Sequence, residues 1–296
     1  MKILKNEPLK QHTSFRVGGP AKVYVVPEDI DELRQLIRFL YKEKLLYDII
    51  GNGTNLLVSD AGVDHVVVEI GRALEGIELL PAANASDAPT SLRVLAGTLL
   101  SKAAQFAATQ ELEGMEALRG IPGTVGGAVT MNAGAYGTEM KNVLLSVEIL
   151  TREGELRTLT PEELELSYRH SVIPERGYIV VAATLALKKG DPVEIQARMA
   201  DFQNRRKEKQ PLDKASAGST FKRPEGYFAG KLIEDTGLRG FRHGGAQVSE
   251  KHCGFIINDG TARAADIYWL IGEVRKRVLM EQHVELTPEV KLWGEF

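Results

Sequence analysis

The segment Gly51-Asn-Gly-Thr-Asn-Leu-Leu57 directly follows Leu45 to Ile50, a short apolar run typical of a buried strand. Glycine tolerates positive φ and lets a ligand approach the backbone closely, and successive N–H groups in such a turn can form a nest for a pyrophosphate. The hydroxyl of Thr54 and the amides of Asn52 and Asn55 would add donors. A tight turn without a ligand has the same composition, so this segment alone leaves both interpretations open.

A second glycine-rich segment runs from Gly120-Ile-Pro-Gly-Thr-Val-Gly-Gly-Ala128 to Met131-Asn-Ala-Gly-Ala-Tyr-Gly137. Its small, mostly uncharged residues predict a long loop. Ordering such a loop costs chain entropy, which favours a large bound ligand over a merely close-packed loop. Neither segment matches a common nucleotide fingerprint, because Leu56 stands where a Rossmann motif has its third glycine and Gly230-Lys-Leu lacks the hydroxyl and spacing of a P-loop. A dinucleotide would therefore need another fold.

Strands and helices alternate around these two segments. In the first 70 residues the patterns predict strands over 22–26, 45–50 and 65–70 and a helix over 30–44 that opens with acidic residues. Residues 71–190 predict strands over 92–96 and 178–187, a helix over 99–110 and a hairpin over 143–159. The polar stretch 81–91 is expected to be an exposed loop. We interpret 1–70 as a small α/β unit and 71–190 as a second, α+β domain.

The remainder of the chain predicts a third domain, residues 191–296. A charged helix over 191–209 ends before Pro211, since proline disfavours helix at the preceding residue. Strands are expected over 254–258 and 290–293. An amphipathic helix lies between them, marked by apolar residues at helical spacing: Ile267, Leu270, Ile271, Val274 and Val278.

Composition restricts the class of protein. The formal net charge of -3 gives no electrostatic reason to expect nucleic acid or a membrane as partner. Cys253 is the only cysteine and the six histidines form no spaced cluster, so no disulfide and no metal site are expected. The start carries charges where a signal peptide needs an apolar run, and no stretch is long enough to span a bilayer. We therefore expect a cytoplasmic protein.

Six segments in order give the chain a resemblance to a known family. They are His12-Thr-Ser-Phe-Arg-Val-Gly-Gly-Pro20, the two glycine segments, Ser167-Tyr-Arg-His-Ser171, Ala217-Gly-Ser-Thr-Phe-Lys-Arg-Pro224 and Leu286-Thr-Pro-Glu-Val290. The chain resembles the UDP-N-acetylenolpyruvoylglucosamine reductases (UDP-N-acetylmuramate dehydrogenases) along nearly its whole length. The resemblance implies an α+β fold: a two-part FAD-binding domain of the vanillyl-alcohol-oxidase type followed by a C-terminal α/β substrate-binding domain.

The resemblance also implies the cofactor and its contacts. FAD would be bound non-covalently and NADPH would supply the hydride. The expected flavin contacts are Gly51, Asn52, Gly53, Thr54, Asn55 and Leu56 in the first segment and Ile121, Pro122, Gly123, Thr124, Gly126, Gly127, Ala133 and Gly134 in the second. Little sequence separates Gly226 from Leu232, so the chain resembles the shorter form of the family, without the substrate-capping tyrosine of the longer form.

The implied reaction reduces UDP-N-acetylglucosamine enolpyruvate to UDP-N-acetylmuramate for peptidoglycan synthesis. Hydride goes to the terminal carbon of the enolpyruvyl group, an enolate develops, and the neighbouring carbon takes a proton. By resemblance Ser219 is the acid, Arg169 holds the enolate charge, and Glu289 lies opposite Arg169, where it should be protonated or bound to cations. Lys222, Arg223 and His252 are candidates for the UDP diphosphate.

Two other interpretations remain open from the sequence. A flavin oxidase of the same fold, acting on an alcohol or hydroxy acid, would use the first two domains but has no use for the Ser219 and Glu289 motifs together. A nucleotide-binding module without turnover would be colourless, or yellow but inert to NADPH.

Overall fold

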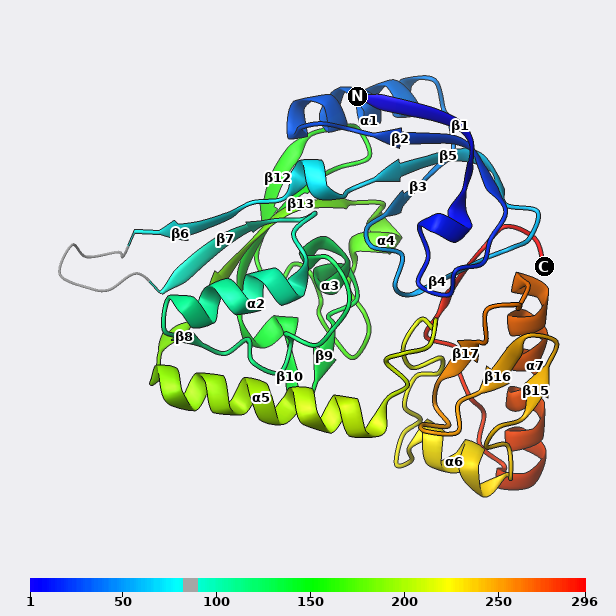
Figure 1. Cartoon of the computed structure of the whole chain (residues 1–296). Helices are drawn as coiled ribbons and strands as arrows, with labels where there is room; N and C mark the ends of the chain where they lie inside the picture. Colours follow the sequence, from blue (N-terminus) through cyan, green and yellow to red (C-terminus); the bar gives the residue numbers. More distant parts are fainter. Residues whose placement is uncertain (82–89) are drawn as a thin grey trace. The chain divides into compact units, whose positions relative to one another are not determined.

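The computed structural model describes residues 1–81 and 90–296 (Figure 1). Most of the expected loop 81–91 lies outside the described residues. The chain forms two compact units, each assembled from several stretches. Unit 1 comprises residues 1–3, 25–52 and 67–204, and unit 2 comprises residues 4–24, 53–66 and 205–296. The division into three domains at residues 70 and 190 stays a prediction.

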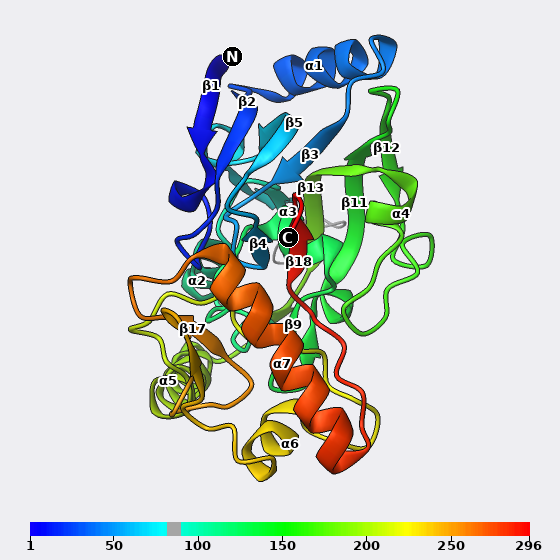
Figure 2. The same cartoon turned by 90° about the vertical axis from the view of Figure 1, so that its right-hand side faces the viewer.

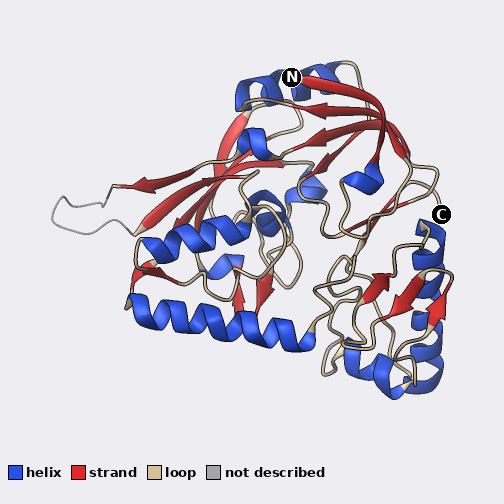
Figure 3. Cartoon of the chain, in the orientation of Figure 1, coloured by secondary structure: helices blue, strands red, loops and turns tan. Residues whose placement is uncertain are grey.

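A five-stranded antiparallel sheet forms the core of unit 1, visible among the red strands of Figure 3. Its order is β12 (Leu156–Leu159), β11 (Leu144–Leu150), β13 (Ile179–Ala186), β7 (Ser91–Leu95) and β6 (Ile77–Leu80). The sequence of β13, Ile-Val-Val-Ala-Ala-Thr-Leu-Ala, is buried along most of its length, as a central strand requires. Helix α2 (Leu100–Thr109) completes the pattern, and the strands, hairpin and helix expected over 92–187 are confirmed.

A second sheet has the order β1 (Lys2–Pro8), β2 (Pro20–Val26), β5 (Val63–Glu69) and β3 (Tyr47–Ile50). Helix α1 (Ile30–Lys42) follows β2, and the Asp29 side chain caps it by accepting a hydrogen bond from the Glu32 N–H at 2.7 Å. Both the helix and its acidic first turn are as expected. The sequence analysis missed β1, because charged and polar residues interrupt any regular alternation in Lys2–Pro8.

Unit 2 buries one face of a long helix against a small sheet. Helix α7 (Ala264–Gln282), orange in Figure 2, contacts the antiparallel strands β15 (Arg242–His243), β16 (Ala246–Val248) and β17 (Ile256–Asn258), which Figure 1 labels. The five apolar residues that predicted this helix are all buried. Helix α6 (Ala229–Asp235) packs on α7 and was not predicted. In unit 2, β4 (Leu56–Val58) pairs in parallel with β18 (Lys291–Trp293).

The remaining elements are short. They are the strand pairs β8 (Leu112–Glu113) with β14 (Lys188–Lys189) and β9 (Gly134–Ala135) with β10 (Thr138–Glu139), the helices α3 (Val125–Thr130) and α4 (Ile173–Arg176), and the 3₁₀ turns Leu9–Gln11, Arg72–Leu74 and Met140–Asn142.

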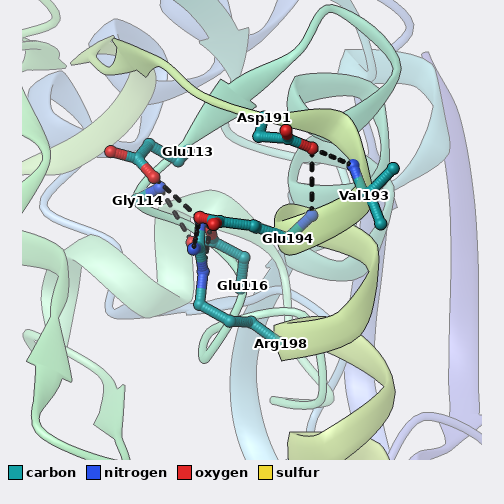
Figure 4. Close-up of polar contacts among 7 residues, drawn as sticks. All are labelled: Glu113, Gly114, Glu116, Asp191, Val193, Glu194 and Arg198. Atoms are coloured by element: carbon teal, nitrogen blue, oxygen red, sulfur yellow. Dashed lines mark hydrogen bonds and ion pairs between the residues drawn. The ribbon is translucent and has the colours of Figure 1, made fainter.

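Helix α5 (Pro192–Lys209) is clamped in unit 1 by one arginine (Figure 4). Arg198 donates from Nε and Nη2 to Glu116 Oε1, at 3.1 and 2.7 Å, and from Nη2 to Glu113 Oε2 at 2.7 Å. The other Glu116 oxygen accepts the Gly114 N–H at 2.8 Å. The Glu116 carboxylate raises the pKa of Arg198, so the guanidinium stays charged. The clamp ties α5 to the turn that precedes the second glycine segment.

Replacing Arg198 by methionine should destabilise unit 1. The Glu116 side chain is only 9% exposed, and its charged carboxylate would keep the Gly114 N–H as its donor. The Arg198 side chain is 38% exposed, so the ion pair contributes less to stability than a fully buried pair would. We expect the free energy of unfolding to fall by about 1–3 kcal/mol. Denaturant titration would measure the loss, and adding Glu116→Gln should recover most of it.

The matched control is Arg157→Met, which breaks the exposed pair with Glu155. It should cost less than about 1 kcal/mol. Equal losses for the two arginine variants would show that the clamp contributes no more than a surface ion pair.

Candidate active site

The two glycine segments lie side by side in unit 1, at Gly51 and Thr124. A Cβ placed on Gly51 would lie 2.6 Å from Thr124 Oγ1, closer than real Cβ atoms approach an oxygen. Any larger residue at position 51 would therefore separate the segments. Two stretches of chain more than sixty residues apart meet here, because Gly51 has no side chain to keep Thr124 away.

The second segment is partly helical, so the expectation of a loop is wrong. Its residues 125–130 form α3, and the Thr124 hydroxyl caps this helix by accepting the Gly127 N–H at 3.3 Å. Val125 and Val129 are buried, and α3 packs on β13. Threonine followed by small and apolar residues is an N-cap signal that the sequence contained, but the flanking glycines obscured it.

The expected flavin contacts of this segment lie on both sides of α3. Ile121, Pro122 and Gly123 precede it, and the Gly123 carbonyl accepts the Leu100 N–H at 2.8 Å. Gly126 and Gly127 lie within the helix, while Ala133 and Gly134 follow it. The backbone of the whole segment is thus held by unit 1.

Arg169 lies next to the end of this segment. Its Nη2 donates to the Gly134 carbonyl at 3.0 Å, and its guanidinium lies 5.0 Å from the Tyr168 ring centre. The backbone of Arg169 has φ of 54°, a left-handed conformation that is uncommon outside glycine and often found at functional sites. Unit 1 therefore brings Arg169 and an expected flavin contact together.

Asn132 is a site residue that the sequence analysis missed. It is fully buried, and its Nδ2 donates to the Ser167 carbonyl at 2.9 Å and to Glu139 Oε2 at 3.0 Å. Its Oδ1 accepts the Lys141 N–H at 3.0 Å. One amide side chain thus joins the second glycine segment to the Ser-Tyr-Arg-His-Ser loop. A single asparagine in a loop gives no sequence signal for such a role.

In unit 2, Ser219 and Glu289 lie on neighbouring extended stretches. Ser219 pairs with Phe255 in an antiparallel bridge, and the Glu289 N–H donates to the Thr220 carbonyl at 2.8 Å. The Glu289 carbonyl in turn accepts Asn55 Nδ2 at 3.1 Å. The Asn55 amide was expected to bind a ligand. It instead donates at least one hydrogen bond to the protein. These contacts unite the Ser219 motif, the Glu289 motif and the first glycine segment.

The first segment keeps backbone donors available. Among the residues that the structure describes, none accepts a hydrogen bond from the N–H groups of Asn52, Gly53 or Thr54. Gly53 has φ of 58°, and a Cβ there would lie 1.8 Å from the His12 carbonyl oxygen. The chain continues through Asn55 into Leu56, the first residue of β4. Three successive N–H groups without an acceptor in the described protein can donate hydrogen bonds to the oxygens of a diphosphate.

The three candidates for the UDP diphosphate all belong to unit 2. The Lys222 N–H donates to the Thr287 carbonyl at 2.8 Å, two residue pairs beyond the Thr220–Glu289 contact. Arg223 Nε donates to the Tyr227 carbonyl at 3.2 Å, and its guanidinium lies over the Phe228 ring. These contacts place both cations beside the Ser219 motif.

His252 differs from the other two candidates. Burial, followed by the nearby Arg239 and Lys209, lowers its pKa. Its Nδ1 accepts the Gly254 N–H at 3.1 Å, so Nε2 remains as its N–H donor. His252 is thus suited to donate a neutral hydrogen bond. Burial also raises the pKa of its neighbour Cys253, which is consistent with packing and not with reactivity.

These observations fit FAD. The first segment offers unsatisfied N–H donors for a diphosphate, and Gly51 leaves the backbone bare where the two segments meet.

Within residues 1–81 and 90–296, no group of three or more His, Cys, Asp or Glu side chains could hold a metal ion. None of the described helices is both long and apolar enough to cross a bilayer.

Replacing Gly51 by alanine should weaken FAD binding. The new methyl group would collide with Thr124 Oγ1, and overpacking of this kind costs about 1–3 kcal/mol, or roughly 5- to 100-fold in the dissociation constant. Fluorescence titration of the apoprotein with FAD would measure it. Gly272→Ala is the matched control, because a Cβ there meets nothing within 4 Å. Equal affinities for both variants would contradict the close approach.

Family models and curated relatives match this chain over most of its length. Residues 21–160 match the family model described as an FAD binding domain, and residues 210–293 match UDP-N-acetylenolpyruvoylglucosamine reductase, C-terminal domain. The reductase of Agathobacter rectalis is 51% identical, over 99% of this chain and 95% of its own length. That of Caldanaerobacter subterraneus subsp. tengcongensis is 49% identical, over 99% and 94%.

A solved structure gives the same result for the fold. The crystal structure of UDP-N-acetylenolpyruvylglucosamine reductase from Thermus caldophilus superposes with a TM-score of 0.83 at 38% identity, covering 99% of this chain and 98% of that one. The expected FAD-binding fold with a C-terminal substrate domain is confirmed. The chain belongs to the UDP-N-acetylenolpyruvoylglucosamine reductase family.

Proposed function

We propose that this protein reduces UDP-N-acetylglucosamine enolpyruvate to UDP-N-acetylmuramate, using NADPH and FAD, in peptidoglycan precursor synthesis. Family membership over the full chain carries this conclusion. It also argues against an oxidase and against a module without turnover. The contact between the Ser219 and Glu289 motifs in unit 2 supports it, because the implied reaction needs both residues at one site.

FAD, when bound, takes hydride from NADPH and delivers it to the enolpyruvyl group. The protein must hold the substrate carboxylate, stabilise the enolate charge that develops on it, and supply one proton. Arg169 suits the first two tasks, because its guanidinium is permanently charged and can bind a carboxylate through two parallel hydrogen bonds. Its contact with the Gly134 carbonyl fixes the side chain next to the second glycine segment.

Ser219 suits the third task. Its side chain is exposed, and its backbone is held by the bridge to Phe255. In the proposed step the Ser219 O–H bond breaks and the proton passes to the substrate carbon that carries the ether oxygen. Solvent then returns a proton to the serine oxygen. An enolate carbon is basic enough to draw a proton from a weak acid that is held in place.

Glu289 is proposed to complete the site from its position beside Thr220. Two main-chain hydrogen bonds, to Thr220 and from Asn55, fix its backbone. The convergence of Arg169, a residue of unit 1, with Ser219 and Glu289, residues of unit 2, is part of the proposal. Lys222, Arg223 and His252 are proposed to hold the UDP diphosphate, the first two as cations and His252 as a neutral donor.

Replacing Ser219 by alanine should separate the two half-reactions. Bleaching of the bound flavin by NADPH should be unchanged, while its reoxidation by the enolpyruvyl substrate should slow by about 10²- to 10⁴-fold, the range for loss of a general acid. Anaerobic stopped-flow absorbance would measure both rates.

Ser216→Ala is the matched control, a serine three residues away in the same extended stretch. It should leave both half-reactions near the wild-type rates. Equal slowing of both half-reactions in Ser219→Ala would argue for a structural role of Ser219 and against proton donation.

A further inference from the structure

Three side chains of unit 2 form a hydrogen-bonded chain around His12. Its Nε2 lies 2.9 Å from Glu7 Oε1, and its Nδ1 lies 2.9 Å from the Tyr24 hydroxyl oxygen. Glu7 is on β1 and Tyr24 on β2, and Tyr24 is 1% exposed. His12 begins the motif that the resemblance singled out and that neither the flavin contacts nor the catalytic residues explain.

The direction of these hydrogen bonds follows from their chemistry. An ionised Glu7 carboxylate can only accept, so His12 Nε2 must carry the hydrogen. A neutral His12 then accepts the Tyr24 hydroxyl hydrogen at Nδ1, whereas a charged His12 donates to the Tyr24 oxygen. In either state both ring nitrogens are engaged, and the ring is held from two sides.

The main chain at His12 contacts the first glycine segment directly. The His12 carbonyl oxygen would lie 1.8 Å from a Cβ on Gly53, so the two backbones touch. Two residues on, the Ser14 N–H donates to the Gly53 carbonyl at 3.1 Å. The turn itself is stiff, because Thr13 Oγ1 donates to the Val17 carbonyl at 2.8 Å and the Arg16 N–H to the Thr13 carbonyl at 3.1 Å.

The position of the ring therefore fixes the position of the loop. A shift of His12 moves its carbonyl, and Gly53 must move with it because no side chain lies between them to absorb the change. The N–H groups of Asn52, Gly53 and Thr54 would then turn away from a bound diphosphate. Preorganised donors bind more tightly than mobile ones, because folding has already ordered them and binding then loses less conformational entropy.

We propose that the Glu7–His12–Tyr24 chain positions the first glycine loop and so sets the affinity for FAD. The three residues act through Gly53 and are positioning residues, not flavin ligands. The inference rests on the proposed use of FAD, and the experiment below tests the two separately.

The test compares FAD binding to apoprotein variants. Tyr24→Phe keeps the ring but removes one hydrogen bond, which should raise the dissociation constant about 3- to 10-fold. His12→Ala removes the centre of the chain and should raise it by about 10-fold or more. The double variant should be no weaker than His12→Ala, because both changes break the same chain. Fluorescence titration with FAD gives the constants.

A second measurement separates positioning from loss of stability. Amide hydrogen exchange in the variant apoproteins should rise at Ser14, whose N–H donates to the Gly53 carbonyl, and at Arg16, whose N–H donates to the Thr13 carbonyl. It should stay unchanged along α7, the buried helix of unit 2. His243→Ala and Tyr268→Phe are the matched controls, since each ring stacks on another aromatic ring elsewhere in unit 2. They should leave the FAD affinity at the wild-type value.

Three outcomes would overturn the proposal. Wild-type affinity in both Tyr24→Phe and His12→Ala would show that the chain does not act on the loop. Faster exchange throughout unit 2, with an equal loss of affinity in the controls, would show a general structural role. Wild-type apoprotein that fails to bind FAD would overturn the proposed function and this inference together.

Discussion

The structure depends on two close approaches at glycines of the first segment, where a side chain on the glycine would not fit. At Gly51 the first glycine segment touches Thr124, and at Gly53 it touches the carbonyl of His12. The first contact belongs to unit 1 and the second to unit 2, although the two glycines are separated by a single residue. The position of the first glycine segment is therefore set by a close contact at each of its two glycines.

The candidate catalytic residues Arg169 and Glu289 are also positioned by contacts with the main chain. Arg169 adopts a left-handed backbone conformation and donates to Gly134, while buried Asn132 fixes the preceding Ser167 carbonyl. In unit 2, Glu289 is held through its main chain by Thr220 and Asn55. In both cases hydrogen bonds to peptide groups set the location of a reactive side chain.

Regular periodicity predicted most of the fold. The α1 and α7 helices and the strands β7, β11 and β13 carry apolar patterns from which their burial could be foreseen. Strand β1 could not, because its residues are mostly exposed and polar, and α6 is too short for its period to show. Helix α3 was hidden by glycines, which are poor helix formers and suggest a loop.

The site was predictable in a different way. Arg169, Ser219 and Glu289 came from resemblance, since their residue types alone favour surface or loop roles. The contacts around Asn132 and His12 needed the structure, because a hydrogen bond between residues that are far apart in the chain leaves no local pattern. The assignment of Asn55 as a ligand donor missed its bond to Glu289 for the same reason.

The pairing of β4 with β18 has a consequence for how the protein is made. Asn55 and Glu289 are 234 residues apart, so the first glycine segment leaves the ribosome long before its neighbouring strand exists. At roughly 5–20 residues per second, this interval is on the order of ten seconds or more. During that time Leu56–Val58 lacks its parallel partner β18 and offers an unpaired edge. Capture of the cofactor is thus a late event in the life of the nascent chain.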